Sequence, residues 1–408
     1  MRLLLLLPTV TYRTVAFVEA ARRLGVELTV ASERPSTFEH ANPAGLVTLD
    51  FTDPTRAAAQ ARAFARELPV HGVVGVDDDT AVIAAVVAEE LGLRGNSVAA
   101  AAAARDKYQQ RVLLAKAGVA VPRVECYPIA SDSQELARHA PYPCVLKPLR
   151  LSASRGVIRA DDAREFVAAF RRLKAMLEEP EVASCGEWAR HLLVEEFIPG
   201  REVAVEGLVT EGRLRVLAIF DKPDPLDGPF FEETIYVTPS RLTPAAHQEI
   251  TACTQATVTA LGLRDGPIHA EIRCNDEGGW LIELAARPIG GRCSGALRFG
   301  AGVSLEEIVI RHALGMELPS LEREGQASGV MMIPVPRGGV LRHVRGVEEA
   351  RAVPLVDAVE ITAHPGQTLV PWPEGARYPG FIFAKGDTPE GVEAALRAAH
   401  GRLEFVIG

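Results

Sequence analysis

The sequence lacks the features of several common protein classes. Its 44 basic residues are outnumbered by 53 acidic residues, and the net charge of −9 comes with no basic cluster, so nucleic acid is not an expected partner. The six cysteines are scattered and form no CxxC pair. This pattern favours free thiols in a reducing compartment over disulfides or a zinc site.

Long hydrophobic runs are also missing. The start, MRLLLLLPTV, is apolar only as far as Pro8, and Tyr12-Arg13 follows where a signal peptide would have a small-residue cleavage site. A buried first strand of a parallel sheet explains the leucines better. No other run approaches the roughly 20 residues that a membrane span needs. We therefore expect a cytoplasmic protein with no membrane partner.

Two familiar nucleotide motifs are absent as well. No glycine-rich dinucleotide fingerprint follows the first strand, which disfavours a nicotinamide enzyme. No GxxxxGK[ST] segment occurs, so a nucleotide site in this chain is not a P-loop. A chain of 408 residues nevertheless has room for two or three domains.

The first 120 residues alternate between expected strands and helices. Near-continuous apolar strands separated by helices predict a parallel sheet covered on both faces, a doubly wound α/β unit. Ligands of such sheets bind beyond the carboxyl ends of the strands, which makes Pro8–Arg13 and Asp77–Asp79 candidate substrate loops. Helix N-capping explains Asp77–Asp79 equally well. The expected elements are strands at Leu3–Leu7, Glu27–Ala31, Leu46–Asp50 and Gly72–Val76 and helices at Thr14–Leu24, Thr55–Glu67 and Thr80–Leu91.

From Val121 onward, charged and small residues interrupt apolar strands. The strand CVLKP carries Lys147, and it runs into a loop of small residues around Ser154 whose backbone N–H groups could close over phosphates. Many loops between strands look alike, so this signal is weak alone. Farther on, Glu202 follows a Pro-Gly turn, where an acid could accept the hydroxyls of a ribose or could simply face solvent at a hairpin tip.

The most informative stretch is Ile268–Arg292. Two segments in which apolar and polar residues alternate flank a turn. Glu271 and Glu283 are equally far from the middle residue of this turn, Glu277. A turn centred on Glu277 makes the two carboxylates neighbours across the strands. Such acids repel unless a divalent cation lies between them, although an exposed hairpin with solvated acids is the alternative.

In order, these motifs resemble the ATP-grasp superfamily, and within it the carboxylate–amine ligases. The matching segments are Asp106-Lys107 with Arg111, VLKPLRLSASRGV, VEEFIPGREVAVEG and HAEI…LIELAARPIGG. The resemblance implies an N-terminal doubly wound domain over residues 1–105, a two-lobed ATP-grasp core over 106–320, and a small α+β C-terminal lobe over 321–408. It also leaves a homodimer open, because relatives are often dimers.

The resemblance implies an ATP site built from lysines and acids. Lys107 and Lys147 match the lysines that contact the phosphates, and Ser154 belongs to the loop that covers them. Glu202 matches the acid that binds the ribose. The residues that match the hinge beside the adenine are Glu195, Glu196, Phe197 and Ile198.

The resemblance also implies a metal and two substrates. Glu271 and Glu283 match the carboxylates that bind magnesium, with manganese as an alternative, and Arg287 matches the arginine that binds the substrate carboxylate or acyl phosphate. Many relatives have an asparagine two residues after the second metal glutamate, where this chain has Ala285. That departure puts a three-ligand site in doubt, and it is typical of the branch of L-amino acid ligase and carnosine synthase.

The expected activity joins an acid and an amine into an amide through an acyl phosphate, with ATP consumed. Weaker substrate-site candidates are Glu233 and His269, as bases for the amine, and Gly291 and Ser294 in the following loop. A structural histidine is the alternative for His269. Two other functions remain open: ATP-grasp chemistry of the purine, formate or carboxylation type, and ATP binding without catalysis.

Overall fold

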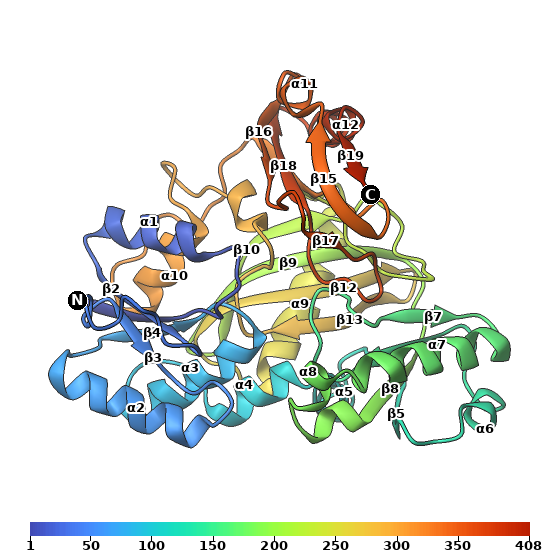
Figure 1. Ribbon diagram of the computed structural model, residues 1–408, viewed down its shortest axis with the longest axis horizontal. Coiled ribbons are helices and arrows are strands. Elements are labelled where there is room, and N and C mark those ends of the chain that lie inside the picture. Colours follow the sequence, from blue (N-terminus) through green and yellow to red (C-terminus); the bar gives the residue numbers. More distant parts are fainter.

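The leucine-rich start forms the inner part of a parallel sheet, as predicted. The computed structural model describes residues 1–408 (Figure 1). Its first sheet has four parallel strands in the order β3-β2-β1-β4. Leu3–Leu6 are fully buried because helices cover both faces. The strands are β1 (Arg2–Leu6), β2 (Glu27–Ser32), β3 (Leu46–Thr48) and β4 (Gly72–Gly75).

The three predicted helices of this N-terminal unit end where the sequence predicted, and they begin at the predicted residue or one to two residues before it. Helix α3 starts with a capping box, in which Asp77 and Thr80 satisfy each other's backbone N–H groups. The capping interpretation of Asp77 is therefore confirmed. The doubly wound α/β unit is confirmed as well. Its helices are α1 (Thr14–Leu24), α2 (Pro54–Glu67), α3 (Asp78–Leu91) and α4 (Val98–Arg105).

A smaller lobe follows, at the lower right of Figure 1. Its four strands pair in the order β5-β8-β6-β7, and the apolar face of α7 (Ala163–Leu177) packs on them around Phe166 and Phe170. Helix α5 (Lys107–Lys116) leads into this lobe. The strands are β5 (Val124–Pro128), β6 (Cys144–Pro148), β7 (Ile158–Ala160) and β8 (His191–Glu196), and the short elements are α6 (Ser133–Ala137), α8 (Pro180–Ala183) and η1 (Glu187–Arg190).

One eight-stranded sheet forms the centre of the molecule. Its order is β13-β12-β9-β10-β11-β14-β18-β16, so strands from beyond residue 320 continue the sheet of the expected core. The boundaries at 105 and 320 stay predictions. The strands are β9 (Arg201–Thr210), β10 (Arg213–Asp221), β11 (Ile235–Thr238), β12 (Gly266–Asn275), β13 (Gly278–Ala285), β14 (Ala327–Met332), β16 (Val356–Ile361) and β18 (Gly380–Gly386).

The remaining elements cover this sheet and complete the C-terminal lobe at the top of Figure 1. A three-stranded sheet there has the order β17-β15-β19. None of the helices combines the length and the apolar character that crossing a membrane would take. These elements are α9 (Pro244–Leu261), η2 (Cys293–Ala296), α10 (Leu305–Ala313), α11 (Val347–Arg351), α12 (Pro389–His400), β15 (Gly339–Arg345), β17 (Thr368–Leu369) and β19 (Glu404–Ile407).

The hairpin β12–β13 pairs Glu271 with Glu283, as predicted, but by a different route. Its turn is tighter than expected: Asn275 pairs with Gly278, so the turn is centred between Asp276 and Glu277. If that register continued along the hairpin, Glu271 would be offset by one residue from Glu283. A β-bulge beside Glu271 shifts the register and restores the pair, because a bulge inserts one residue into one strand.

Candidate functional site

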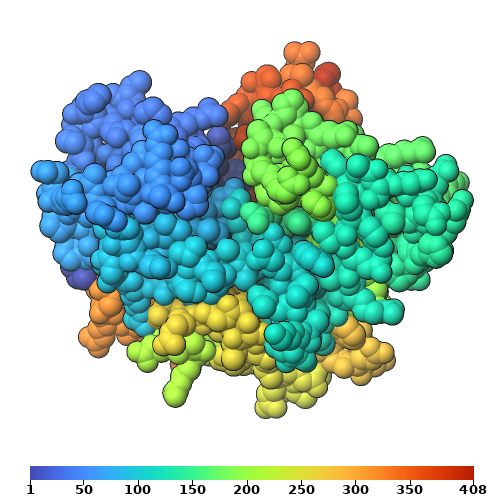
Figure 2. Space-filling model, turned by 90° about the horizontal axis from the view of Figure 1, so that it is seen from below, coloured from blue at the N-terminus to red at the C-terminus, as the bar shows by residue number.

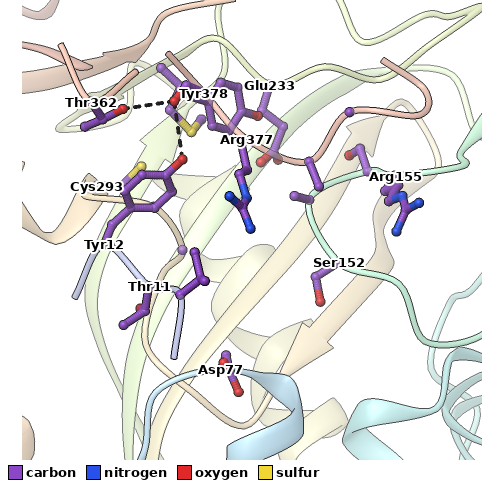
Figure 3. Close-up of a pocket in the computed structure, with 18 of the residues that line it drawn as sticks. Thr11, Tyr12, Asp77, Ser152, Arg155, Glu233, Cys293, Thr362, Arg377 and Tyr378 are labelled. Carbon is purple, nitrogen blue, oxygen red and sulfur yellow. Dashed lines mark hydrogen bonds between the residues drawn. The ribbon is translucent and has the colours of Figure 1, made fainter. Parts of the chain in front are cut away.

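A cavity of about 1110 Å³ opens between the N-terminal unit, the hairpin and the C-terminal lobe. Figure 2 shows the surface hollowed between the blue N-terminal part and the green segments that face it. Side chains from these three parts, from the loop between β6 and β7 and from the segment after the hairpin line this cavity, including Tyr12, Ser152, Cys293 and Arg377 (Figure 3). We refer to it as the large cavity.

A narrower pocket lies beside the large cavity, between the smaller lobe and the central sheet. It is lined by residues that the sequence assigned to ATP: Lys107, Lys147, Phe197 and Glu202, among others. We refer to it as the nucleotide pocket. Three residues border both spaces, namely Ser154, Glu271 and Glu283. The predicted metal acids therefore stand where the two spaces meet.

Lys107 reaches this junction from the first turn of α5. Asp106 caps the helix by accepting from the backbone N–H of Gln109, and the side chain of Lys107 is directed at Glu283, with 3.0 Å between Nζ and Oε1. Its Nζ also donates to the carbonyl of Leu151, at 3.0 Å. A cation in the first helical turn opposes the helix dipole, and Glu283 offsets that cost.

Lys147 and Glu195 form a buried ion cluster with Arg111. Lys147 Nζ lies 2.5 Å from Glu195 Oε2, and Arg111 Nε lies 3.0 Å from Oε1. Burial alone would raise the pKa of Glu195, but the two cations lower it. Burial also lowers the pKa of Lys147, although Glu195 opposes that shift. The carboxylate of Glu195 thus forms its ion pairs with buried cations. Glu196 instead pairs with exposed Arg123, at 2.7 Å.

Lys222 connects the expected ribose acid to the expected metal acid, and sequence reasoning missed it. Its Nζ lies 2.7 Å from Glu202 and 3.3 Å from Glu271, and it also donates to Glu233. The other oxygen of Glu202 accepts from Arg273 at 2.9 Å. Lys222 lies in a segment rich in proline and aspartate, where only turn signals could be read. The signal that could have found it is a lone lysine at the end of a buried strand.

The donor set at this junction suits a hard divalent cation. Glu202, Glu233 and Glu271 each place an oxygen within 4.8 Å of the others, and Glu283 faces Glu271 across the hairpin. Burial would raise the pKa of Glu271, but Lys222 and His269 bring it well below its ordinary value, so the carboxylate stays ionised. Carboxylate oxygens are the ligands that Mg²⁺ prefers. Ala285 adds no ligand, as the sequence indicated.

His269 is held between two acids. Its Nδ1 lies 3.4 Å from Glu206, which is fully buried, and its Nε2 lies 3.7 Å from Glu271. Burial disfavours the imidazolium, but the neighbouring carboxylates of Glu206 and Glu271 overcome this effect and raise the pKa of His269. Both oxygens of Glu206 also accept from the backbone N–H of Ile289. This geometry fits an orienting histidine that also lines the large cavity.

Arg287 joins the hairpin to the N-terminal unit. Its guanidinium is bidentate on Asp78, with 3.0 Å from Nε to Oδ1 and 3.2 Å from Nη2 to Oδ2. Ser152 also donates to Asp78, at 2.7 Å. Burial would raise the pKa of Asp78, but Arg287 and Ser152 lower it to about 2. One aspartate thus ties the expected substrate arginine to the loop that carries Ser154.

Comparison with known proteins bears on this geometry. Three family models match the chain: an ATP-grasp N-terminal domain over residues 18–95, an ATP-grasp domain over 140–296, and the L-amino acid ligase C-terminal domain 2 over 331–408. An L-amino acid ligase from Bacillus licheniformis has a similar structure, with a TM-score of 0.82 and 27% identity, over 100% of this chain and 98% of that chain.

The chain belongs to the ATP-grasp superfamily. Alanine–anticapsin ligase of Bacillus subtilis is 32% identical over 213 residues, 49% of this chain and 44% of that protein. Human carnosine synthase 1 is 28% identical over 333 residues, 77% of this chain and 40% of that protein. The matched segment therefore covers less than half the length of each of these two ligases. The predicted branch, that of L-amino acid ligase and carnosine synthase, is confirmed.

The ATP-grasp core brings most of the predicted substrate residues to the large cavity, with one exception. Glu233, His269, Arg287 and Gly291 line it. Ser294 does not. Its hydroxyl donates to Glu306, at 2.6 Å, on the first turn of α10. The short helix η2 turns this side chain toward α10, which the sequence motif could not reveal.

Proposed function

We propose that this ATP-grasp protein is an ATP-dependent carboxylate–amine ligase. The observation that carries the proposal is the junction of two spaces. The nucleotide pocket and the large cavity share Ser154, Glu271 and Glu283, so a phosphate from one side would meet a carboxylate from the other at two acids suited to a metal. Phosphoryl transfer depends mainly on such positioning and on neutralised charge.

In this proposal Glu271 and Glu283 hold magnesium, or manganese in its place, which neutralises phosphate charge when bound. Lys107 and Lys147 contact the phosphates, and Ser154 covers them. The hinge residues Glu195, Glu196, Phe197 and Ile198 face the adenine side, and Glu202 faces the ribose. Because Glu195 is buried against two cations, its contribution is to place Lys147 rather than to contact the base directly.

The reaction begins with the acid in the large cavity beside Arg287. A carboxylate oxygen attacks the γ-phosphorus, the bond between that phosphorus and the β,γ-bridging oxygen breaks, and ADP leaves with an acyl phosphate formed. Arg287 and Lys147 offset the negative charge that develops. The amine nitrogen then attacks the acyl carbon, the C–O bond to phosphate breaks, and the amide remains after the amine loses a proton.

Glu233 suits the role of accepting that proton. It lines the large cavity, and burial raises its pKa to about 7, with Lys222 opposing the shift. A base with a pKa near the operating pH is effective in proton transfer. His269 is oriented toward Glu271 and serves better to hold that acid.

The test is product analysis with a mixture of the standard L-amino acids, ATP and magnesium. The proposal predicts ADP release together with an amide identified by mass spectrometry. Glu283→Gln is expected to abolish both ADP release and amide formation. The control variant Glu277→Gln, which changes an exposed acid in the turn of the same hairpin, is expected to keep them.

ATP binding without ADP release for any acid–amine pair would favour a binding protein. Release only with formate or bicarbonate and a ribonucleotide would favour the purine or carboxylation type. Parental ATP hydrolysis by Glu283→Gln would refute the metal assignment.

A further inference from the structure

The loop that borders both spaces is tied to the C-terminal lobe by a short segment, Trp372–Glu374. The indole Nε1 of Trp372 donates to the carbonyl of Ala153 at 2.7 Å, and Gly156 N–H donates to the carbonyl of Pro373 at 2.8 Å. The Nε of Arg155 donates to the carbonyl of Glu374 at 3.1 Å. Three consecutive residues thus bind one loop that lies more than 200 positions earlier.

The loop needs such support because its backbone is strained. Ala153 and Ser154 have φ of 57° and 53°, in the left-handed region that residues with a Cβ rarely adopt. Such conformations persist only where surrounding structure holds them, and they gather at ligand clamps. Trp372 bonds directly to the carbonyl of Ala153, the first of the two strained residues.

The segment itself is anchored from both sides. Arg172 of α7 makes a bidentate ion pair with Glu374, at 2.5 and 2.8 Å, which ties it to the smaller lobe. On the other side the ring of Trp372 packs on Tyr378, with 4.8 Å between ring centroids. The loop and the segment therefore form one unit held between the smaller and C-terminal lobes.

The same segment continues into the wall of the large cavity. Tyr378 lines that cavity, and its carbonyl accepts from Tyr12 and Thr362. Arg377 makes no ion pair and extends its guanidinium into the cavity (Figure 3). A substrate with an anionic group there would contact the chain five residues from Trp372.

We propose that Trp372 is a positioning residue, which holds the Ser152–Gly156 loop over the nucleotide pocket and links that loop to occupancy of the large cavity through Arg377 and Tyr378. This inference rests on the proposed function in one respect: it assumes that the nucleotide pocket binds ATP. A positioning role for Trp372 explains why the C-terminal lobe, which contributes none of the predicted catalytic residues, contacts a loop of the nucleotide pocket. In the sequence, nothing about the lobe's residue types indicated this.

The experiment follows trypsin cleavage of the loop, since Arg150 and Arg155 provide cleavage sites in and beside it. Trp372→Phe keeps an aromatic ring, smaller than the indole, and removes the donor. Loss of one neutral hydrogen bond predicts a roughly 2- to 10-fold faster loop cleavage and a similar fall in affinity for the ATP analogue AMP-PNP with magnesium. Trp188→Phe is the matched control, because its indole donates to the Cys185 carbonyl at 3.1 Å, away from the loop.

A second variant keeps the test meaningful if Trp372→Phe folds poorly. Glu374→Gln removes a half-exposed ion pair with Arg172, and it is expected to shift cleavage and affinity in the same direction by a smaller factor. Cleavage rates and affinities for both variants equal to those of Trp188→Phe would overturn the positioning role.

The link to the large cavity is tested by adding the amino-acid mixture to the nucleotide-bound protein. The mixture is expected to slow loop cleavage in the parent and to lose this effect in Trp372→Phe. An equal effect in both proteins would overturn the link. Neither readout needs turnover, so a parent that makes no amide but shows these shifts would refute the proposed function and leave the positioning role in place.

Discussion

Glu195 and Glu196 are adjacent acids whose replacement should have very different consequences. Glu195 is the carboxylate that contacts both Arg111 and Lys147, and all three side chains are at most 5% exposed. Glu196 pairs with Arg123, whose side chain is 80% exposed. The two substitutions, Glu195→Gln and Glu196→Gln, make the same chemical change at neighbouring positions of one strand and differ only in the burial of the ion pair.

Removing one partner of a buried ion cluster costs about 3–5 kcal/mol, because the remaining charges stay buried without compensation. An exposed pair contributes only about 0–1 kcal/mol. In a cooperative unit of 150–250 residues, 1 kcal/mol corresponds to roughly 2–4 °C in Tm, so Glu195→Gln should lower Tm by roughly 6–20 °C. Glu196→Gln should lower it by no more than roughly 4 °C.

The assay is thermal unfolding with and without ATP and magnesium. Phosphates brought next to Lys147 would restore a negative partner, so ATP should raise Tm more in Glu195→Gln than in the parent. Equal, small losses of Tm for both variants would refute the view that Glu195 sits in a dry ion cluster. An ATP effect no larger in Glu195→Gln than in the parent would refute the placement of phosphates beside Lys147.

Two pH predictions follow from the other acids of the site. The pKa of Asp78, about 2 against an ordinary 3.8, contributes about 2 kcal/mol to stability, which is present above pH 3.8 and lost as the pH falls toward 2. Urea unfolding should therefore find Asp78→Asn less stable than the parent at pH 7, by at least this amount, with a smaller gap near pH 3; a constant gap would contradict the pairing with Arg287. The pKa of Glu233, raised to about 7, means that the folded state holds its proton more tightly than the unfolded state, so the free energy of unfolding should fall as pH rises from about 4.5 to 7. Glu233→Gln should remove that slope and also the rise of amide formation through pH 7; an unchanged pH–rate profile would exclude Glu233 as the base.

Local sequence patterns predicted the elements well because periodicity, caps and turns are local properties. The strand Cys144–Pro148 and the helix Thr14–Leu24 both have the predicted bounds. The pairing of Glu271 with Glu283 was also predicted, though through the wrong turn centre. A bulge depends on how neighbouring strands twist and pack, which the alternation of side chains does not record.

The parts that the sequence missed all depend on contacts between distant segments. Lys222 bridges acids from three different parts of the chain, and only the folded sheet brings them together. The sequence also does not show the contact of Trp372, because its partner lies in a loop of another lobe. Likewise, no local pattern shows that strands after residue 320 extend the sheet that carries the metal acids.

In the proposed reaction, a carboxylate is activated by phosphoryl transfer at the junction of Glu271 and Glu283. The most direct measurement uses an acid substrate with ¹⁸O in its carboxylate, in the presence of ATP, magnesium and the amine. Because the attacking oxygen becomes the bridge of the acyl phosphate and leaves with phosphate, we expect one labelled oxygen in the released phosphate for each amide formed. Amide formation with unlabelled phosphate, or with the label in AMP, would contradict the proposed reaction.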